Sequence, residues 1–123
     1  MNGAVWDFRS LRCWQRARAL VRDVYQATET YPRAERFGLT SQTRRSCVSI
    51  AANLAEGCGR RGSAEFARFV DIATGSAFEL ECHLVLAKDL GFLDAQAAAT
   101  LLVEVDQVKR MLIALAKVLR QRR

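Results

Sequence analysis

Apolar side chains recur every three or four positions in the first third of the chain, which is the spacing of one face of an α-helix. The pattern predicts a helix over about residues 10–30, with Ser10 as its N-cap. Tyr31 precedes the only proline, Pro32, and the residue before a proline is pushed out of the helical region, so the helix should end there. The positions that carry the pattern are Leu11, Trp14, Ala17, Val21, Val24 and Tyr25.

The same spacing predicts three further helices. Their expected spans are residues 40–57, 63–90 and 94–121. Hydroxyl or carboxylate side chains stand where these helices begin and can cap their free amides: Thr40 or Ser41, Ser63 and Asp94. Gly57 and Gly91 stand where the first two of them end. No window has the alternation of a strand, so the expected fold is all-α, an antiparallel up-and-down four-helix bundle in one domain over residues 1–123.

The second helix is unusual because it is built mostly from small residues, which lets another backbone approach closely. Residues 46–57 read SCVSIAANLAEG, and Ser46, Ser49, Asn53 and Glu56 form a polar stripe along them. Glu56 is at the C-terminal end of the helix, where the helix dipole disfavours an anion. We therefore expect an arginine to hold its carboxylate.

The third helix has Gly75 in its middle, where glycine costs about 1 kcal/mol relative to alanine. Close packing against the small residues of the second helix, or against another chain, explains it best. Two interpretations stay open: a tight helix crossing with a few satisfied polar contacts, or a buried polar network that fixes register or forms an oligomer interface. The residues of the second interpretation are Arg45, Ser49, Asn53, Glu56, Ser76 and Glu79.

The chain has 123 residues and carries 19 Lys and Arg against 13 Asp and Glu, a net charge of +6. Its longest stretch without a charged residue is short of the roughly 20 residues that a membrane helix needs, and no apolar signal segment follows Met1. These features predict a soluble protein in the cytoplasm that does not contact a membrane. The four cysteines form no CxxC pair, so we expect them to be reduced and mostly buried.

Charge is unevenly distributed, because residues 63–107 are acidic whereas the segments on either side are basic. Most of the basic residues are arginine, whose planar guanidinium binds phosphate or carboxylate through two parallel hydrogen bonds. In an up-and-down bundle the start of the first helix and the end of the fourth share a pole, so their arginines can merge into one surface. The candidate nucleic-acid-binding residues are Arg9, Arg12, Arg16, Arg60, Arg61, Arg120, Arg122 and Arg123.

Few aromatic side chains stand beside these arginines, so we expect contacts with the phosphate backbone of RNA or DNA rather than with base sequence. Two other interpretations of the arginines remain: an ordinary solvated surface, or charge used for contacts between subunits. A genome with a biased base composition would also enrich arginine.

Signals for catalysis are weak throughout the chain. Residues 57–62 spell GxGxxG, but they follow a helix rather than a strand, which favours a glycine cap and a hairpin loop over a dinucleotide site. His83 is the only histidine and has Glu79 one turn before it, whereas a di-iron bundle needs two such motifs. Cys58 lies beside two arginines that can lower its thiol pKa, which does not by itself make an enzyme. We expect no catalytic residues, no metal, no cofactor and no small-molecule substrate.

The chain resembles the 23S ribosomal RNA intervening-sequence protein family, small four-helix bundle proteins of bacteria. The similarity covers residues 8–93, with a generic fourth helix behind it. Leu54, where the family more often has isoleucine, and Cys58 and Cys82 depart from the pattern. The matching positions are Phe8, Leu11, Trp14-Gln15, Tyr31-Pro32, Glu35, Phe37-Gly38-Leu39-Thr40, Gln42, Arg44-Arg45, Ser49-Ile50, Asn53 to Gly57, Gly59-Arg60, Glu65-Phe66, Phe69, Ala73, Gly75-Ser76 and Glu79-Leu80-Glu81.

The resemblance implies a four-helix bundle that assembles into a homopentameric ring. It also implies an affinity for nucleic acid, because distant relatives are accessory proteins of diversity-generating retroelements and bind it. It implies no reaction, since the family has no established catalytic residues. Two hypotheses follow: a non-enzymatic ring that binds RNA or DNA through arginine-rich surfaces, or a protein-binding scaffold whose charges serve subunit contacts alone.

Overall fold

The structure is a computed structural model that describes residues 7–122. It contains four α-helices, α1 (Arg12–Thr28), α2 (Leu39–Cys58), α3 (Gly62–Asp89) and α4 (Ala95–Arg120), and two 3-10 turns, η1 (Phe8–Ser10) and η2 (Arg33–Glu35). There is no β-strand within the described residues. The expected all-α four-helix fold is therefore confirmed.

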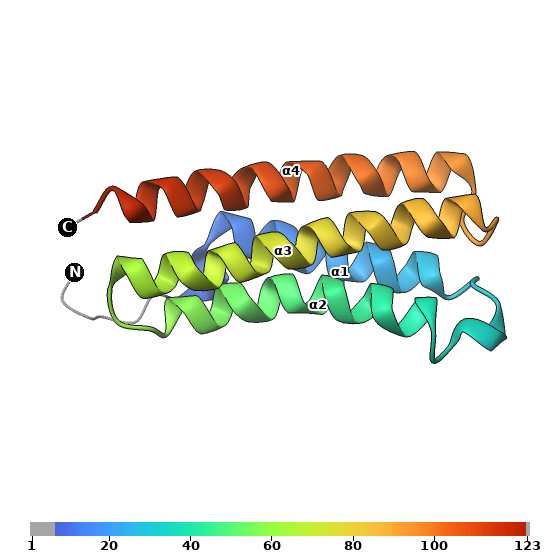
Figure 1. Ribbon diagram of the computed structural model, residues 1–123, viewed down its shortest axis with the longest axis horizontal. Coiled ribbons are helices and arrows are strands. Elements are labelled where there is room, and N and C mark those ends of the chain that lie inside the picture. The colour runs from blue at the N-terminus through green and yellow to red at the C-terminus, as the bar shows by residue number, and fades with distance from the viewer. Residues whose placement is uncertain (1–6, 123) are drawn as a thin grey trace.

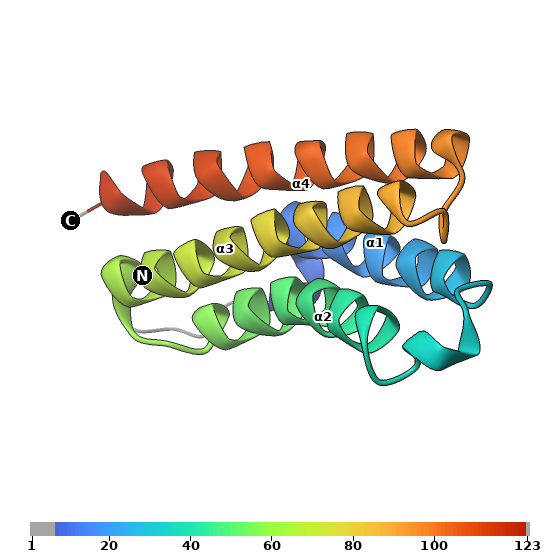
Figure 2. The same cartoon turned by 45° about the vertical axis from the view of Figure 1, so that its right-hand side comes forward.

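The helices run alternately in opposite directions (Figure 1), and their contacts close them into a square in which each helix has two neighbours. Each helix packs against its neighbours in the chain, and α1 also packs against α4. Within the described residues the backbones of the diagonal pairs, α1 with α3 and α2 with α4, do not approach each other closely. Because α1 has 17 residues whereas α3 has 28 and α4 has 26, the start of α3 and the end of α4 project beyond the start of α1 (Figures 1 and 2).

The core lies between the four helices and draws large aliphatic side chains from each of them. Leu20 of α1, Ile50 of α2, Leu80 of α3 and Leu112 of α4 are at most 1% exposed. Burial of one such side chain contributes about 1.5–3 kcal/mol. The periodic apolar positions of the sequence are thus the ones that hold the bundle together.

α1 begins two residues later than predicted, because Ser10 does not cap it. Asp7 caps the turn η1 instead: its carboxylate accepts a hydrogen bond from the Arg9 amide at 3.0 Å. The Ser10 hydroxyl donates back to the Asp7 carbonyl at 2.8 Å, and Leu11 takes the N-cap position without a side-chain hydrogen bond. The prediction of Ser10 as N-cap is wrong because its hydroxyl is used within η1.

Two other helix starts are fixed by carboxylates. Asp94 caps α4 as predicted, since its Oδ1 accepts a hydrogen bond from the Ala97 amide at 2.8 Å. α2 begins at Leu39, because Oε1 of Glu35 in η2 accepts the Leu39 amide at 3.0 Å. The side chain that starts α2 therefore comes from the preceding turn and not from Thr40 or Ser41.

Gly57 is a point of close helix contact rather than a helix cap. A β-carbon at this position would lie 2.8 Å from a ring carbon of Phe66 and 3.0 Å from Cβ of Phe69. α2 continues to Cys58, and Gly59 takes the C-cap position. The predicted cap at Gly57 is wrong, because α3 crosses α2 there too closely for any side chain.

Both ends of α3 depend on glycines in the left-handed region, which favours residues without a β-carbon. Gly62 begins the helix with φ of 78° after the N-cap residue Arg61, so Ser63 is not the N-cap that the sequence predicts. At the other end Gly91, also with φ of 78°, closes a Schellman motif in which the Phe92 amide bonds the Ala87 carbonyl at 2.9 Å.

The structure contradicts the expectation for Gly75 and agrees with the expectation that the cysteines are mostly buried. Gly75 is exposed, and no described atom outside its own helix backbone lies within 4 Å of its β-carbon position, so close packing against α2 does not explain it. Cys82 is exposed, whereas Cys13, Cys47 and Cys58 are buried as expected. Gly75 and Cys82 both lie on the outer side of α3.

Candidate nucleic-acid interface

Basic and acidic side chains lie on opposite sides of the bundle. α1 contains four arginines and one carboxylate, whereas α3 contains five carboxylates and two basic residues. Because α1 and α3 are diagonal in the square, their exposed sides face in opposite directions. The exposed arginines of the α1 face are Arg12, Arg16, Arg18 and Arg22.

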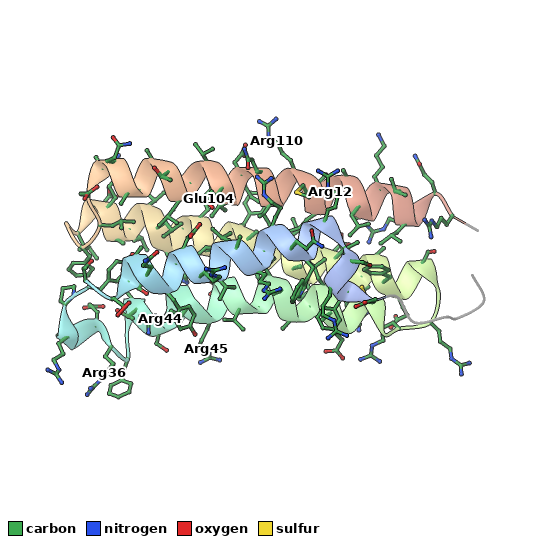
Figure 3. The ribbon with its side chains drawn as sticks, turned by 180° about the vertical axis from the view of Figure 1, so that it is seen from behind. Arg12, Arg36, Arg44, Arg45, Glu104 and Arg110 are labelled. Carbon is green, nitrogen blue, oxygen red and sulfur yellow. The ribbon has the colours of Figure 1, made fainter. Side chains whose placement is uncertain are left out.

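The arginines around the start of α1 differ in whether their guanidiniums already contact other side chains of the protein. Arg9 forms an ion pair with Asp7 at 3.4 Å and lies over the Phe8 ring. Arg16 donates a hydrogen bond to the Gln107 side chain on α4. Arg12 has no ion pair within the described part of the chain and lies beside α4 (Figure 3). Of the three predicted residues here, Arg12 is the most available to a ligand.

A pair of carboxyl groups interrupts the basic surface between α1 and α4. Burial raises the pKa of Glu104 to about 7, and a hydrogen bond with Asp23 and its negative charge add to the effect, while Arg16 opposes it. Both carboxyls line a cavity of about 400 Å³. Near neutral pH Glu104 is therefore protonated in part, so this seam carries less negative charge than two ionised carboxylates would.

The end of α4 does not merge with the start of α1, contrary to the sequence prediction. Arg16 contacts Gln107, whereas Arg120 forms two hydrogen bonds with Asp71 on α3. Gln107 and Arg120 are about 20 Å apart along α4 at a rise of about 1.5 Å per residue. The two groups stay separate because the short α1 begins beside the middle of α4; Arg122 is exposed near its end, and Arg123 lies outside the described residues.

The arginines of the α2–α3 loop have different roles. Arg60 holds Glu56 at 2.5 Å and stacks over the Phe69 ring at 4.9 Å, which confirms that an arginine compensates the carboxylate at the end of α2. Glu56 consequently lies outside the polar network in which the sequence placed it. Arg61 is exposed at the N-cap of α3 and forms no ion pair with another described residue.

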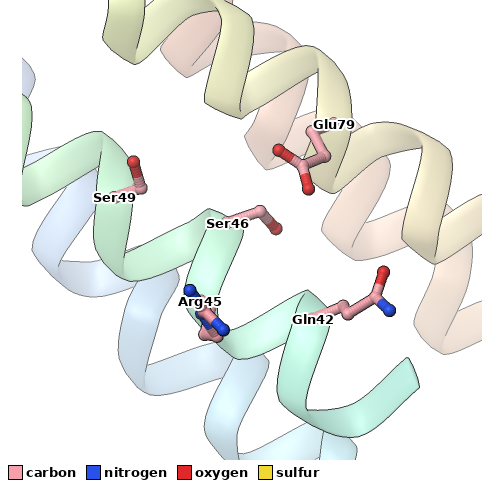
Figure 4. A pocket seen from close by; sticks show the side chains of 5 residues that line it. All are labelled: Gln42, Arg45, Ser46, Ser49 and Glu79. Atoms are coloured by element: carbon pink, nitrogen blue, oxygen red, sulfur yellow. The ribbon is translucent and has the colours of Figure 1, made fainter. Parts of the chain in front are cut away.

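A polar cleft of about 390 Å³ lies between α2 and α3 (Figure 4). Gln42 and Ser46 project from α2 on one side, and Glu79 projects from α3 on the other. Arg45 lies on the surface of α2 at the edge of this cleft, pointing away from Glu79. Arg45 and Glu79, both members of the predicted network, thus share a cleft without forming an ion pair.

Three members of the predicted polar network are joined by hydrogen bonds. The hydroxyls of Ser49 and Ser76 are 2.9 Å apart across the helix crossing. The side-chain amide of Asn53 donates a hydrogen bond to the backbone carbonyl of Ser49 at 2.9 Å. Glu79 bonds Nε2 of His83 at 3.3 Å instead. The network is therefore a local crossing contact, smaller than the one expected.

The surroundings of Cys58 do not lower the pKa of its thiol, as its two neighbouring arginines could have done. Burial raises the pKa of its thiol to about 11, and the charge of Asp7 adds to the shift. The side chain is 1% exposed and belongs to the core, so the neighbouring arginines, which point outward, do not stabilise a thiolate. No group of three or more His, Cys, Asp or Glu side chains within the described residues can hold a metal ion.

Sequence reasoning missed three arginines that meet where α1 connects to α2. Arg33, Arg36 and Arg44 line a pocket of about 350 Å³ together with Thr28, Glu29 and Thr40; we call it the corner pocket. Arg44 lies between α1 and α2, and Arg36 lies at the outer edge of the connection (Figure 3). Pro32 followed by two arginines three residues apart was the available signal, since side chains at that spacing align in a 3-10 turn.

The arrangement suits anion binding at exposed arginines. None of the helices in the described part of the chain is long and apolar enough to cross a membrane.

Comparisons with known proteins agree with this architecture. The model of the family described as 23S rRNA-intervening sequence protein matches residues 9–114. The crystal structure of a protein of unknown function from the S23 ribosomal protein family of Bacteroides thetaiotaomicron is similar, with a TM-score of 0.77 and 20% sequence identity over 85% of this chain and 98% of that one. At this identity the likeness concerns the fold alone. The comparison with curated proteins gives no match.

Proposed function

Because the chain belongs to the 23S rRNA-intervening sequence protein family, we propose that it is a non-enzymatic protein that assembles with copies of itself and binds RNA or DNA. The ligand contacts exposed arginines, and the assembly is the ring of five subunits that the family resemblance implies. The protein acts in the cytoplasm, where nucleic acid is available to it.

The observation that carries the proposal is the separation of charge across the bundle. The arginines of the α1 face have one carboxylate among them, whereas the acidic residues gather on α3, diagonally opposite. A nucleic acid approaching the α1 face therefore meets a positive surface that the carboxylates of α3 do not neutralise. Neutralising phosphates in this way releases counterions, so binding should weaken steeply as salt is raised.

Assembly is supported by the outer side of α3. Ile72 and Leu86 are 42% and 44% exposed there, and Gly75 and Cys82 lie between them on the same line. These four residues, the outer line of α3, recur at helical spacing and so share one face. No described atom outside the helix's own backbone approaches the β-carbon position of Gly75. This line, on which the exposed Glu79 also lies, suits close approach of a second copy at the glycine.

The test is light scattering coupled to size exclusion, with and without a short RNA stem-loop, at low and then at high salt. The wild-type chain should elute as an oligomer that gains mass with RNA at low salt and loses it at high salt. The variant Arg12→Ala/Arg18→Ala/Arg22→Ala should assemble normally and bind at least tenfold more weakly. Its matched control, Arg68→Ala/Arg110→Ala/Lys117→Ala, removes the same charge from α3 and α4 and should bind like wild type.

An oligomer that ignores RNA at low salt would overturn nucleic-acid binding. The protein-binding scaffold would then be the better function, with the charges of α1 and α3 serving subunit contacts. A monomer at all concentrations would instead overturn the assembly.

A further inference from the structure

The structure assigns a second binding site to this protein: the corner pocket takes the phosphate of an unpaired nucleotide, whose base stacks on the exposed ring of Phe37. The inference rests on the proposed function and names the part of a nucleic acid that this site recognises. Most of the site lies in the connection between α1 and α2, which belongs neither to the α1 face nor to the outer line of α3.

The cationic side of the pocket is built by the turn η2. The Glu35 amide bonds the Pro32 carbonyl at 2.9 Å and the Arg36 amide bonds the Arg33 carbonyl at 3.1 Å. In such a turn side chains three residues apart lie one above the other, so Arg33 and Arg36 reach the same pocket. Both are exposed, and within the described chain neither is neutralised by an ion pair.

The third guanidinium is held in place before any ligand arrives. Nε of Arg44 donates to the Thr28 hydroxyl at 2.8 Å, and one terminal nitrogen donates to the Tyr25 carbonyl at 3.3 Å. The same guanidinium lies 4.4 Å from the centre of the Tyr25 ring. These contacts leave part of its donor edge free, and a fixed guanidinium loses little entropy when it binds an oxygen of a phosphate.

The rest of the pocket is polar and mostly favourable to an anion. The side chain of Thr40 lines it from the first turn of α2, whose amides are positive in partial charge. Glu29 is the only carboxylate among the lining residues. Three guanidiniums outnumber it, but it opposes a phosphate, and this makes it a useful probe.

Phe37 explains why the ligand is a nucleotide and not phosphate alone. Its side chain is 84% exposed, the most exposed large apolar side chain of the described residues. The Arg36 guanidinium lies 4.8 Å from the centre of its ring. An exposed ring beside phosphate-binding arginines is the arrangement by which proteins stack bases of single strands, because every base has a π-face to offer.

The backbone around Phe37 is firmly set, which a stacking platform needs. The Gly38 amide bonds the Glu35 carbonyl at 2.9 Å, and a β-carbon at Gly38 would lie 2.9 Å from the Glu35 carboxylate. That carboxylate also accepts the Leu39 amide. Phe37 is thus presented by a braced turn and not by a loose loop.

The experiment is a fluorescence titration of the full chain with a single-stranded RNA hexamer that carries one 2-aminopurine, whose emission is quenched when it stacks. Wild type should bind and quench. Phe37→Ala should lose the quenching and bind roughly tenfold more weakly, the value expected for one lost stacking contact. Arg33→Ala/Arg36→Ala should weaken binding more than tenfold and reduce the slope of affinity against salt by about 0.7 per lost phosphate contact.

Two controls separate this site from general charge. Arg68→Ala/Arg110→Ala removes the same charge from α3 and α4 and should change affinity by less than threefold. Glu29→Gln removes the opposing carboxylate and should tighten binding severalfold, which a purely structural role would not produce. Each variant changes an exposed side chain, and thermal melting checks that it folds.

The outcomes also separate this inference from the proposed function. Suppose wild type binds both the hexamer and a fully paired RNA, and the corner variants match the charge control with quenching intact. The corner site is then overturned while nucleic-acid binding stands. Binding to the duplex alone would likewise overturn the corner site and leave nucleic-acid binding in place. Binding to neither RNA overturns both.

Discussion

Gly57 on α2 and Phe66 on α3 lie so close that a β-carbon on Gly57 would come within 2.8 Å of the Phe66 ring. Gly57 is buried, and Phe66 is 3% exposed. The ring therefore has little room to move away. This contact fixes how closely α2 and α3 cross near the α2–α3 loop.

Gly57→Ala should consequently destabilise the protein, because the added methyl overpacks the crossing. We expect the free energy of unfolding to fall by about 1–3 kcal/mol, measured by urea denaturation. Gly59→Ala is the matched control, since its β-carbon would be 3.5 Å from the nearest atom, the Glu56 carbonyl. Equal stability of the two variants would contradict the close contact at Gly57.

Gly75→Ala should have the opposite effect on a separated subunit. The position is helical, exposed and open, so alanine should raise the free energy of unfolding by about 1 kcal/mol. Urea denaturation at high dilution measures this gain. If the outer line of α3 is the subunit contact, the same variant should assemble more weakly in light scattering, and unchanged assembly would count against that interface.

The helix spans could be predicted from the sequence because periodic burial of one face decides them. The details at the helix ends could not. Ser10 has the chemistry of an N-cap, but its hydroxyl donates to the backbone carbonyl of Asp7 within the 3-10 turn instead. In the sequence Gly57 has the position of a helix cap. In the structure it is the point where α3 crosses α2, and the side chains that require a glycine there belong to α3.

The candidate site divides in the same way. Arg12 and Arg16 are one helical turn apart in sequence, so their common face could be predicted from spacing alone. Arg44 joins Arg33 only through the packing of α2 against α1 and the turn η2. Ion pairs between helices, such as that of Arg120 with Asp71, also depend on tertiary packing. They determine which of the predicted arginines are free to bind a ligand.

Cys82 should be the one thiol that reacts quickly in the native subunit. It is exposed, whereas burial raises the pKa of Cys13 and Cys47 to about 12 and so suppresses the reactive thiolate. Titration with a coloured disulfide reagent should therefore count one fast thiol in dilute native protein and four in denaturant. Cys82→Ser should remove the fast phase.

Because Cys82 is on the outer line of α3, assembly should protect it. The fast phase should slow as protein concentration rises through the range in which light scattering detects the oligomer. A fast rate that is independent of concentration would place the subunit contact elsewhere. A second fast thiol in wild type would contradict the burial of the other three.

The carboxyl pair between α1 and α4 makes stability depend on pH in an uncommon direction. The pKa of Glu104 is raised in the folded state to about 7, mainly by burial and next by Asp23, whereas a free glutamate titrates near pH 4.3. Between these two values the folded state binds more protons than the unfolded one. The stabilising contribution is therefore complete below about pH 4.3 and is lost as pH rises through about 7.

Urea denaturation from pH 5 to pH 8 should accordingly show this group lowering the free energy of unfolding as pH increases. Glu104→Gln imitates the protonated carboxyl, so it should flatten the dependence and be more stable than wild type at pH 8. Glu56→Gln, which makes the same charge change on a carboxylate paired with Arg60 at the surface, should keep the wild-type slope. If Glu104→Gln keeps that slope as well, the Asp23–Glu104 contact does not control stability near neutral pH.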